Sequence, residues 1–104
     1  ILSSVKKTGR IIVLDFGPSF LSVASEIISI VSIKGHKYLK SAPKKITLPD
    51  FPVPTSYGLT KDFYPDIKKI IKECEKIFKR KIFYKNTNKS LHHDVPDLNF
   101  KGPF

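Results

Sequence analysis

The stretch that decides the fold is Gly9–Pro18, which reads GRIIVLDFGP. Five of the six residues over 11–16 are apolar, several of them are β-branched, and glycines bound the run on both sides. A short, continuous apolar run of this kind is typical of a strand that is covered on both faces in a parallel sheet. We therefore predict a buried strand over 11–16.

A helical pattern follows this strand. Ser19 is a candidate N-cap, and Glu26 is almost the only charge in the segment. The apolar residues recur at three- and four-residue steps: Phe20, Leu21, Val23, Ala24, Ile27, Ile28, Ile30 and Val31. We predict a helix over 20–31 that comes to its end near Gly35. Because its apolar surface is so wide, we expect protein to cover it on more than one side.

The rest of the pattern predicts a strand, a loop and a second helix. Residues 45–48 form a short apolar strand candidate. Three prolines over 49–56 fix φ and remove backbone donors, which predicts an extended surface loop. Pro65 suits the first turn of a helix that continues to Phe78. This helix has a narrow apolar stripe that includes Cys74, and lysines and glutamates surround the stripe.

The order strand, helix, strand, loop, helix belongs to an α/β layered design. Two strands are few for an independent sheet. Since Ile1 is not a methionine and begins inside a patterned segment, we interpret the chain as a piece of a larger protein with further strands upstream. From Lys81 onward the pattern dissolves. We therefore predict a domain over 1–80 and a C-terminal extension over 81–104 that is ordered only when it docks.

The net charge of +10 and the pI near 9.8 raise the alternative of a basic module that binds nucleic acid or another polyanion. Of the nineteen basic residues, only Arg10 and Arg80 are arginine, the residue that suits bidentate phosphate and base recognition. The lysines are spread along the chain, which is typical of a solvated basic surface. The alternative predicts a contiguous lysine face and association that weakens steeply with salt.

The cellular setting follows from three absences in the sequence. A single cysteine allows no internal disulfide, which favours a reducing compartment. No apolar run approaches the roughly 20 residues of a membrane span, and the first ten residues lack a signal-peptide pattern. We expect the cytoplasm, or the matrix of an organelle in a eukaryote, and no membrane partner.

The chain contains no motif that predicts catalysis. Adjacent side chains in His92–Asp94 point in different directions, and no third spaced ligand accompanies them. His36 lacks Asp or Ser at triad spacing, and Cys74 lies among isoleucines as a core residue would. The isolated glycines form no phosphate-binding loop. We predict no catalytic, cofactor-binding or metal-binding residue in this chain.

Two acids and three aromatic residues have both a structural and a functional interpretation. Asp15 ends the first strand, where ligands of open α/β sheets bind, and Asp50 precedes the proline loop. Each either caps a backbone turn, which we favour, or contacts a partner at an interface. Phe63, Tyr64 and Phe104 are either core residues or anchors in a subunit contact, where aromatic residues are enriched.

Several short motifs, in the same order and spacing, resemble the beta subunit of the first component of 2-oxo acid dehydrogenase complexes. Val5–Gly17 reads VKKTGRIIVLDFG and is similar to the family stretch VxKTGRxxVxDxG. Ala24–Ile27 resembles the AEI helix, and Ala42–Pro54 resembles APxxRVTxPDxPxP. Leu59–Pro65 stands where many members read LEDxxLP. The similarity covers about residues 2–78.

The resemblance implies the transketolase C-terminal domain, a three-layer α/β/α fold with a mostly parallel sheet, here without its first strands. In this family the beta subunit pairs with an alpha subunit, and thiamine diphosphate and magnesium bind between them. The cofactor decarboxylates a 2-oxo acid and passes the acyl group to a lipoyl group. The residues for that chemistry lie in the alpha subunit and in the N-terminal domain of beta, so the resemblance implies no cofactor in this chain.

The implied role is a non-catalytic assembly domain. Its partners would be the remainder of the beta subunit, the alpha subunit, a second beta subunit and the lipoyl-bearing second component, and the isolated chain should self-associate. The expected interface residues are Phe20, Leu21, Ile27, Ile28, Pro52, Pro54, Phe63, Tyr64 and Phe104. Two departures stand out: Thr60 and Lys61 replace acidic residues, and Leu21 and Ser22 replace glycines that often follow the first strand.

Overall fold

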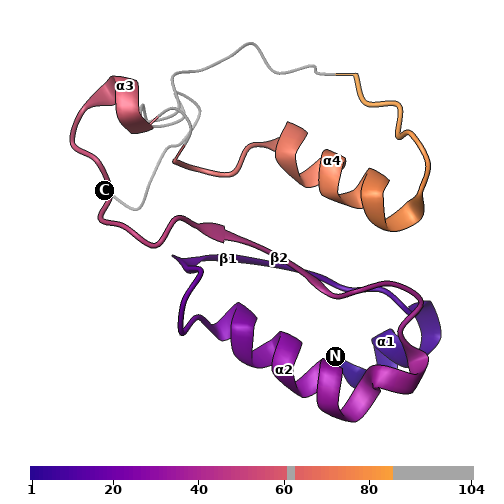
Figure 1. Cartoon of the computed structure of the whole chain (residues 1–104). Helices are drawn as coiled ribbons and strands as arrows, with labels where there is room; N and C mark the ends of the chain where they lie inside the picture. The colour runs from indigo at the N-terminus through magenta and orange to yellow at the C-terminus, as the bar shows by residue number, and fades with distance from the viewer. Residues whose placement is uncertain (61–62, 86–104) are drawn as a thin grey trace, which may run out of the picture.

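The computed structural model describes residues 1–60 and 63–85. Its elements, in chain order, are α1 (Leu2–Thr8), β1 (Ile12–Pro18), α2 (Val23–Gly35), the 3-10 helix η1 (His36–Tyr38), β2 (Lys44–Leu48), α3 (Tyr57–Thr60) and α4 (Ile67–Phe78) (Figure 1). The predicted proline loop over 49–56 contains no helix or strand, and α2 ends at Gly35 as expected. The predicted extension over 81–104 lies largely outside the described residues.

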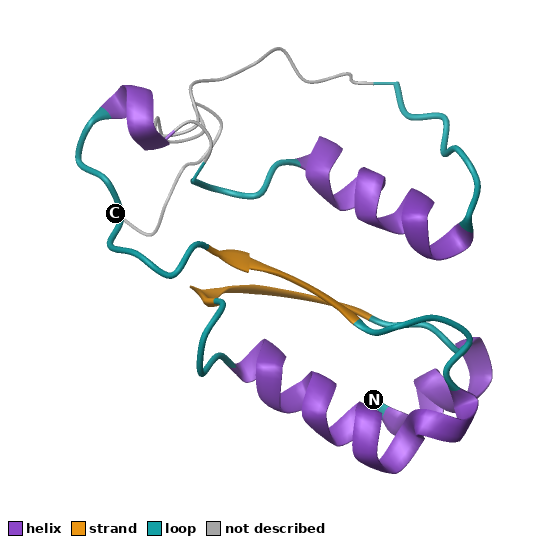
Figure 2. Cartoon of the chain, in the orientation of Figure 1, coloured by secondary structure: helices purple, strands orange, loops and turns teal. Residues whose placement is uncertain are grey.

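The two strands pair in parallel, with α2 as the crossover between them. The register joins Ile12 to Lys44 and Leu14 to Ile46 and becomes irregular toward Pro18. Helices α1 and α2 lie on one side of the strand pair and α4 lies on the other (Figure 2). The predicted α/β class and the parallel pairing are therefore confirmed, and the described part has three layers with the strands in the middle.

Helix α1 was not predicted. It contributes Val5, which is 2% exposed, to the core against α2. Gly35 lies at this contact, where a Cβ would meet side-chain atoms of Leu2, Val31 and Val5 at 3.4–3.8 Å, which is ordinary van der Waals distance. The helix ends at Gly9, whose φ of 73° is left-handed and whose N–H donates to the Val5 carbonyl. Glycine adopts this conformation without strain.

Two predicted helix starts are wrong. Helix α2 begins at Val23, and its N-cap is Ser22 rather than Ser19. Strand β1 runs on to Pro18, and Leu21 has a φ of 51°, which no helix accommodates, so the helix starts only after this turn. Pro65 precedes the first turn of α4, since Asp66 is the N-cap and its carboxylate accepts from the Lys69 N–H at 2.7 Å.

The prediction that β1 is covered on both faces is also wrong within the described structure. Leu14 is 54% exposed and Phe16 is 76% exposed. On α2, Val31 is fully buried, whereas Val23 and Ile33 are each more than 70% exposed. The strand pair and α1 cover one side of α2, and the short α4 leaves much of the opposite sheet face open. The apolar pattern therefore exceeds what this chain can bury by itself.

Candidate subunit interface

The carboxyl ends of β1 and β2 lie at the same edge of the strand pair, because the strands are parallel. The loops that leave them are therefore neighbours. The backbone N–H of Phe20, in the first loop, donates to the Asp50 carboxylate in the second at 2.7 Å. This hydrogen bond joins two segments that are thirty residues apart in sequence.

Asp15 fixes the first loop at both of its ends. One carboxylate oxygen accepts from the Gly17 N–H and the other accepts from the Ala24 N–H, each at 2.9 Å. These two hydrogen bonds, the one from Gly17 foremost, hold the pKa of the Asp15 carboxyl below its ordinary value, because both favour the charged form. Asp15 thus caps its own backbone turn at Gly17, as the interpretation that we favoured from the sequence expects, whereas the Asp50 carboxylate accepts from Phe20 in another loop.

A second polar network braces the same loop from β2. The Lys45 ammonium donates to the Ser19 carbonyl at 2.5 Å and to the Ser25 hydroxyl at 2.7 Å. The Ser25 hydroxyl also donates to the Ser19 carbonyl, and it lies 3.1 Å from the hydroxyl of Ser22. The sequence analysis missed Lys45. The sequence shows only that Lys45 alternates with the apolar Ile46 in a strand candidate; that Lys45 pairs in register with Val13 is known from the structure.

Large apolar side chains stand exposed on this braced backbone. We name them the carboxyl-edge patch: Phe16, Phe20, Leu21, Val23, Phe51 and Val53. Each is more than half exposed, and Leu21 reaches 85%. Exposed apolar residues that gather on neighbouring segments mark interaction sites more often than single exposed residues do. Leu21 also holds a left-handed backbone that costs a non-glycine residue free energy.

The predicted interface residues differ in exposure and in their position relative to the patch. Phe20 and Leu21 belong to the patch, Pro52 is exposed beside it, and Pro54 is half-buried. Ile27 and Ile28 are half-buried on α2. Phe16 was missed from the sequence. Val23, Phe51 and Val53 were not named individually, but they lie in the helix 20–31 and the proline loop 49–56, the two segments expected to hold subunits together.

The structure places Phe63 in the core of this chain, at 3% exposure. Its ring packs edge-to-face on Phe51 and Tyr64, with centroid distances of 5.4 and 5.1 Å. Tyr64 remains 38% exposed. Phe104 lies outside the described residues.

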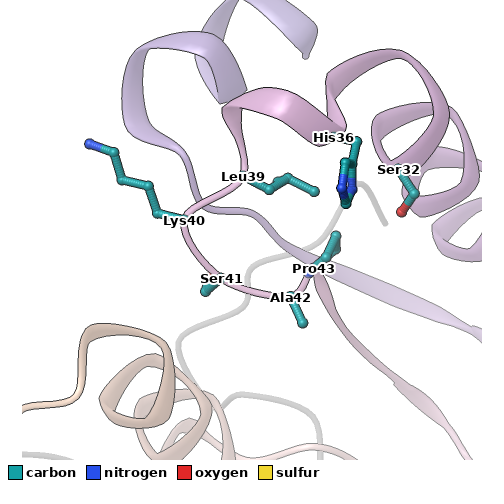
Figure 3. Close-up of a pocket in the computed structure, with 7 residues that line it drawn as sticks. All are labelled: Ser32, His36, Leu39, Lys40, Ser41, Ala42 and Pro43. Carbon is teal, nitrogen blue, oxygen red and sulfur yellow. The ribbon is translucent and has the colours of Figure 1, made fainter.

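A shallow pocket of about 410 Å³ lies around η1 and the loop before β2 (Figure 3). Its lining consists of Ser32, His36, Leu39, Lys40, Ser41, Ala42 and Pro43. His36 and Lys40 are the only titratable side chains in this lining, and no carboxylate accompanies them. The pocket therefore lacks an acid–base pair or a triad.

The other candidates for chemistry do not gather into a site within the described part of the chain. No three His, Cys, Asp or Glu side chains there come close enough to hold a metal ion. Cys74 is half-buried on α4. Residues 92–94 lie outside the described residues. None of the described helices is both long enough and apolar enough to cross a bilayer.

Comparison with known proteins gives one family. The family model described as "Transketolase, C-terminal domain" matches residues 1–70. The beta subunit of acetoin:2,6-dichlorophenolindophenol oxidoreductase from Bacillus subtilis is 37% identical over 71 residues, which is 68% of this chain and 21% of that protein. No solved structure gives a significant match.

Two further relatives carry the name pyruvate dehydrogenase E1 component subunit beta. The protein from Mycoplasma pneumoniae is 38% identical over 58 residues, covering 56% of this chain and 18% of its own length. The protein from Rickettsia bellii is 31% identical over 77 residues, covering 74% of this chain and 24% of its own length. The chain thus spans only about a fifth of the length of these curated relatives.

Proposed function

The chain belongs to the transketolase C-terminal domain family, and on that premise we propose that it is a non-catalytic assembly domain of a thiamine diphosphate-dependent 2-oxo acid dehydrogenase beta subunit. The observation that supports this role is the carboxyl-edge patch, where six large apolar side chains stay more than half exposed over a hydrogen-bonded backbone. A braced backbone loses little conformational freedom on binding, which favours association.

The partners that we propose are the remainder of a beta subunit, an alpha subunit and a second copy of this domain, with the lipoyl-bearing component as a further partner. Relatives named as subunits of pyruvate dehydrogenase and of an acetoin-oxidising enzyme support this choice. The proposed location is the cytoplasm or an organelle matrix. The patch includes three phenylalanines, and subunit interfaces are enriched in aromatic residues.

The resemblance implies thiamine diphosphate and magnesium in the parent enzyme. Magnesium requires oxygen ligands. The two carboxylates at the carboxyl edge accept from backbone N–H groups of this chain, and within the described residues no three His, Cys, Asp or Glu side chains gather that could hold a metal ion. We propose that other parts of the parent enzyme hold the cofactor, and that this domain contributes to the site only by fixing the relative position of the subunits.

Size-exclusion chromatography with light scattering tests the proposal. The wild-type chain is mixed with the 2-oxo acid dehydrogenase alpha subunit of the same organism and is also run alone. In at least one of these runs we expect a complex: either the chain alone has a molar mass above that of one chain, or the chain elutes together with the alpha subunit at a mass that includes both. The double variant Phe20→Ser, Leu21→Ser removes two side chains that are 72% and 85% exposed, so the fold keeps most of its own contacts.

We expect this variant to associate at least about 100-fold more weakly, because burying two such side chains contributes about 3 kcal/mol. The control is Phe83→Ser, since Phe83 is fully exposed, follows α4 in the chain and is not a residue of the carboxyl-edge patch. Equal association of the double variant and the control would refute the proposed interface, and so would a wild-type chain that stays monomeric both alone and in the mixture.

A further inference from the structure

Helix α4 has two faces of different chemistry. Ile77, on its apolar stripe, is 6% exposed and is covered by the rest of the chain. At 100° per residue, five lysines fall on the opposite side, and all are exposed. We name them the lysine stripe: Lys68, Lys69, Lys72, Lys76 and Lys79. The stripe extends about 16 Å along the helix, from its first turn to its C-cap.

The carboxylates of this helix neutralise only one of the five stripe lysines by an ion pair within the described residues. Glu73 forms an ion pair with Lys76, and the hydrogen bond from that lysine lowers the pKa of Glu73. The carboxylate of Glu75 accepts from the Ile82 backbone N–H at 2.8 Å. The other four stripe lysines form no ion pair with any described residue. Lysines at four-residue spacing repel each other and weaken the helix, so the stripe has a cost in the free chain that an anionic partner would remove.

The chemistry of the stripe selects among anionic partners. Both arginines of the chain lie over the ring of Phe78, at 5.3 and 5.7 Å from its centroid, so neither belongs to the stripe. The stripe offers only ammonium groups, which bind carboxylates and phosphates alike as point charges. Its five residues include no aromatic ring for stacking bases, which single-stranded nucleic-acid sites use. Insertion into a lipid surface would require the whole apolar face, and Ile77 on that face is buried within the chain, so a lipid surface would bind the stripe by charge alone.

We propose that the lysine stripe is a docking surface for an acidic protein segment. A helical segment with carboxylates at three- and four-residue steps matches the spacing of the ammonium groups. The stripe lies on α4, on the other side of the strand pair from α2, and it shares no residue with the carboxyl-edge patch. The proposal is therefore independent of the assembly role and can fail without it.

Fluorescence anisotropy of the full chain tests the proposal with a labelled, glutamate-rich helical peptide. A glutamine version of the peptide, an oligothymidylate of equal charge and phosphatidylserine vesicles serve as competitors. The stripe variant carries Lys68→Gln, Lys69→Gln, Lys72→Gln and Lys79→Gln. Its matched control carries the same change at Lys7, Lys34, Lys37 and Lys40, which are exposed residues outside α4. Both variants have the same net charge, and glutamine keeps the helix propensity of lysine.

We expect the stripe variant to bind the acidic peptide about tenfold more weakly than wild type, and the control to bind less than about twofold more weakly. Circular dichroism confirms that both variants keep their helix content. Equal losses in the two variants would overturn the proposal, because net charge alone would then explain binding. Tighter binding of the oligothymidylate or the vesicles than of the acidic peptide would overturn it as well.

Discussion

Leu21 tests whether a residue at the carboxyl edge lowers the stability of the free chain while it strengthens association. Its φ is 51°, and its side chain is 85% exposed, so the chain holds a strained leucine that packs on little of its own structure. We predict that Leu21→Gly slightly stabilises the free chain and weakens its association. A residue retained only for folding would show the opposite pattern.

The magnitude follows from three terms. A left-handed conformation costs a leucine about 1–2 kcal/mol, which glycine does not incur. Glycine loses about 0.5–1 kcal/mol more than other residues in conformational entropy on folding. The covered fraction of the side chain is small, so its lost burial costs only about 0.3 kcal/mol. The net effect is a stabilisation of about 0.5 kcal/mol.

Urea denaturation followed by circular dichroism measures this difference, with Leu21→Ala as the matched control. Alanine also loses the side chain but keeps the strain, so it should fall below wild type by about 0.3 kcal/mol. The glycine variant should therefore be more stable than the alanine variant. A glycine variant that is less stable than the alanine variant would refute the reasoning, since the backbone would then not be strained at this position.

Two further predictions concern the scaffold beneath the patch. Ser22→Ala should lower the free energy of unfolding by about 1 kcal/mol in urea denaturation, because the Ser25 N–H loses its side-chain acceptor; a change below about 0.3 kcal/mol would contradict this. Asp15→Asn should flatten the acid dependence of stability. The folded pKa of Asp15 is depressed, so its contribution is present above the unfolded pKa of about 3.9 and is lost as pH falls through the folded value. Equal loss of stability in wild type and variant below about pH 4 would contradict this assignment.

The main elements of the fold could be predicted because their apolar patterns are long. The run over 11–16 indicated β1, and the recurrent apolar spacing indicated α2 and α4. Helix α1 was not predicted because it is short and buries only Val5, so the sequence contains no periodic apolar stripe there. The start of α2 was misplaced because Ser19 and Ser22 are both competent caps. The choice between them depends on how far β1 runs, which sequence spacing does not show.

The candidate interface could be predicted only in part. Phe20 and Leu21 were identified, although as helix residues rather than as a loop. Phe16 was missed because a continuous apolar run indicates burial on both faces, and the pattern does not show which protein covers it. Phe51 lies in the predicted proline loop but was not named, because its ring contact with Phe63 joins two segments that no local pattern relates. The hydrogen bond between Phe20 and Asp50 is a contact of high sequence separation that no local pattern contains.

The most direct test of the central claim, that the carboxyl edge is a protein–protein interface, is the molar mass of this chain in a mixture with its alpha subunit. We predict that wild type and Phe83→Ser form a complex in that mixture and that Phe20→Ser, Leu21→Ser elutes at the mass of the free chain. A complex that forms equally well with the double variant would show that the exposed apolar residues at the carboxyl edge do not hold the subunits together.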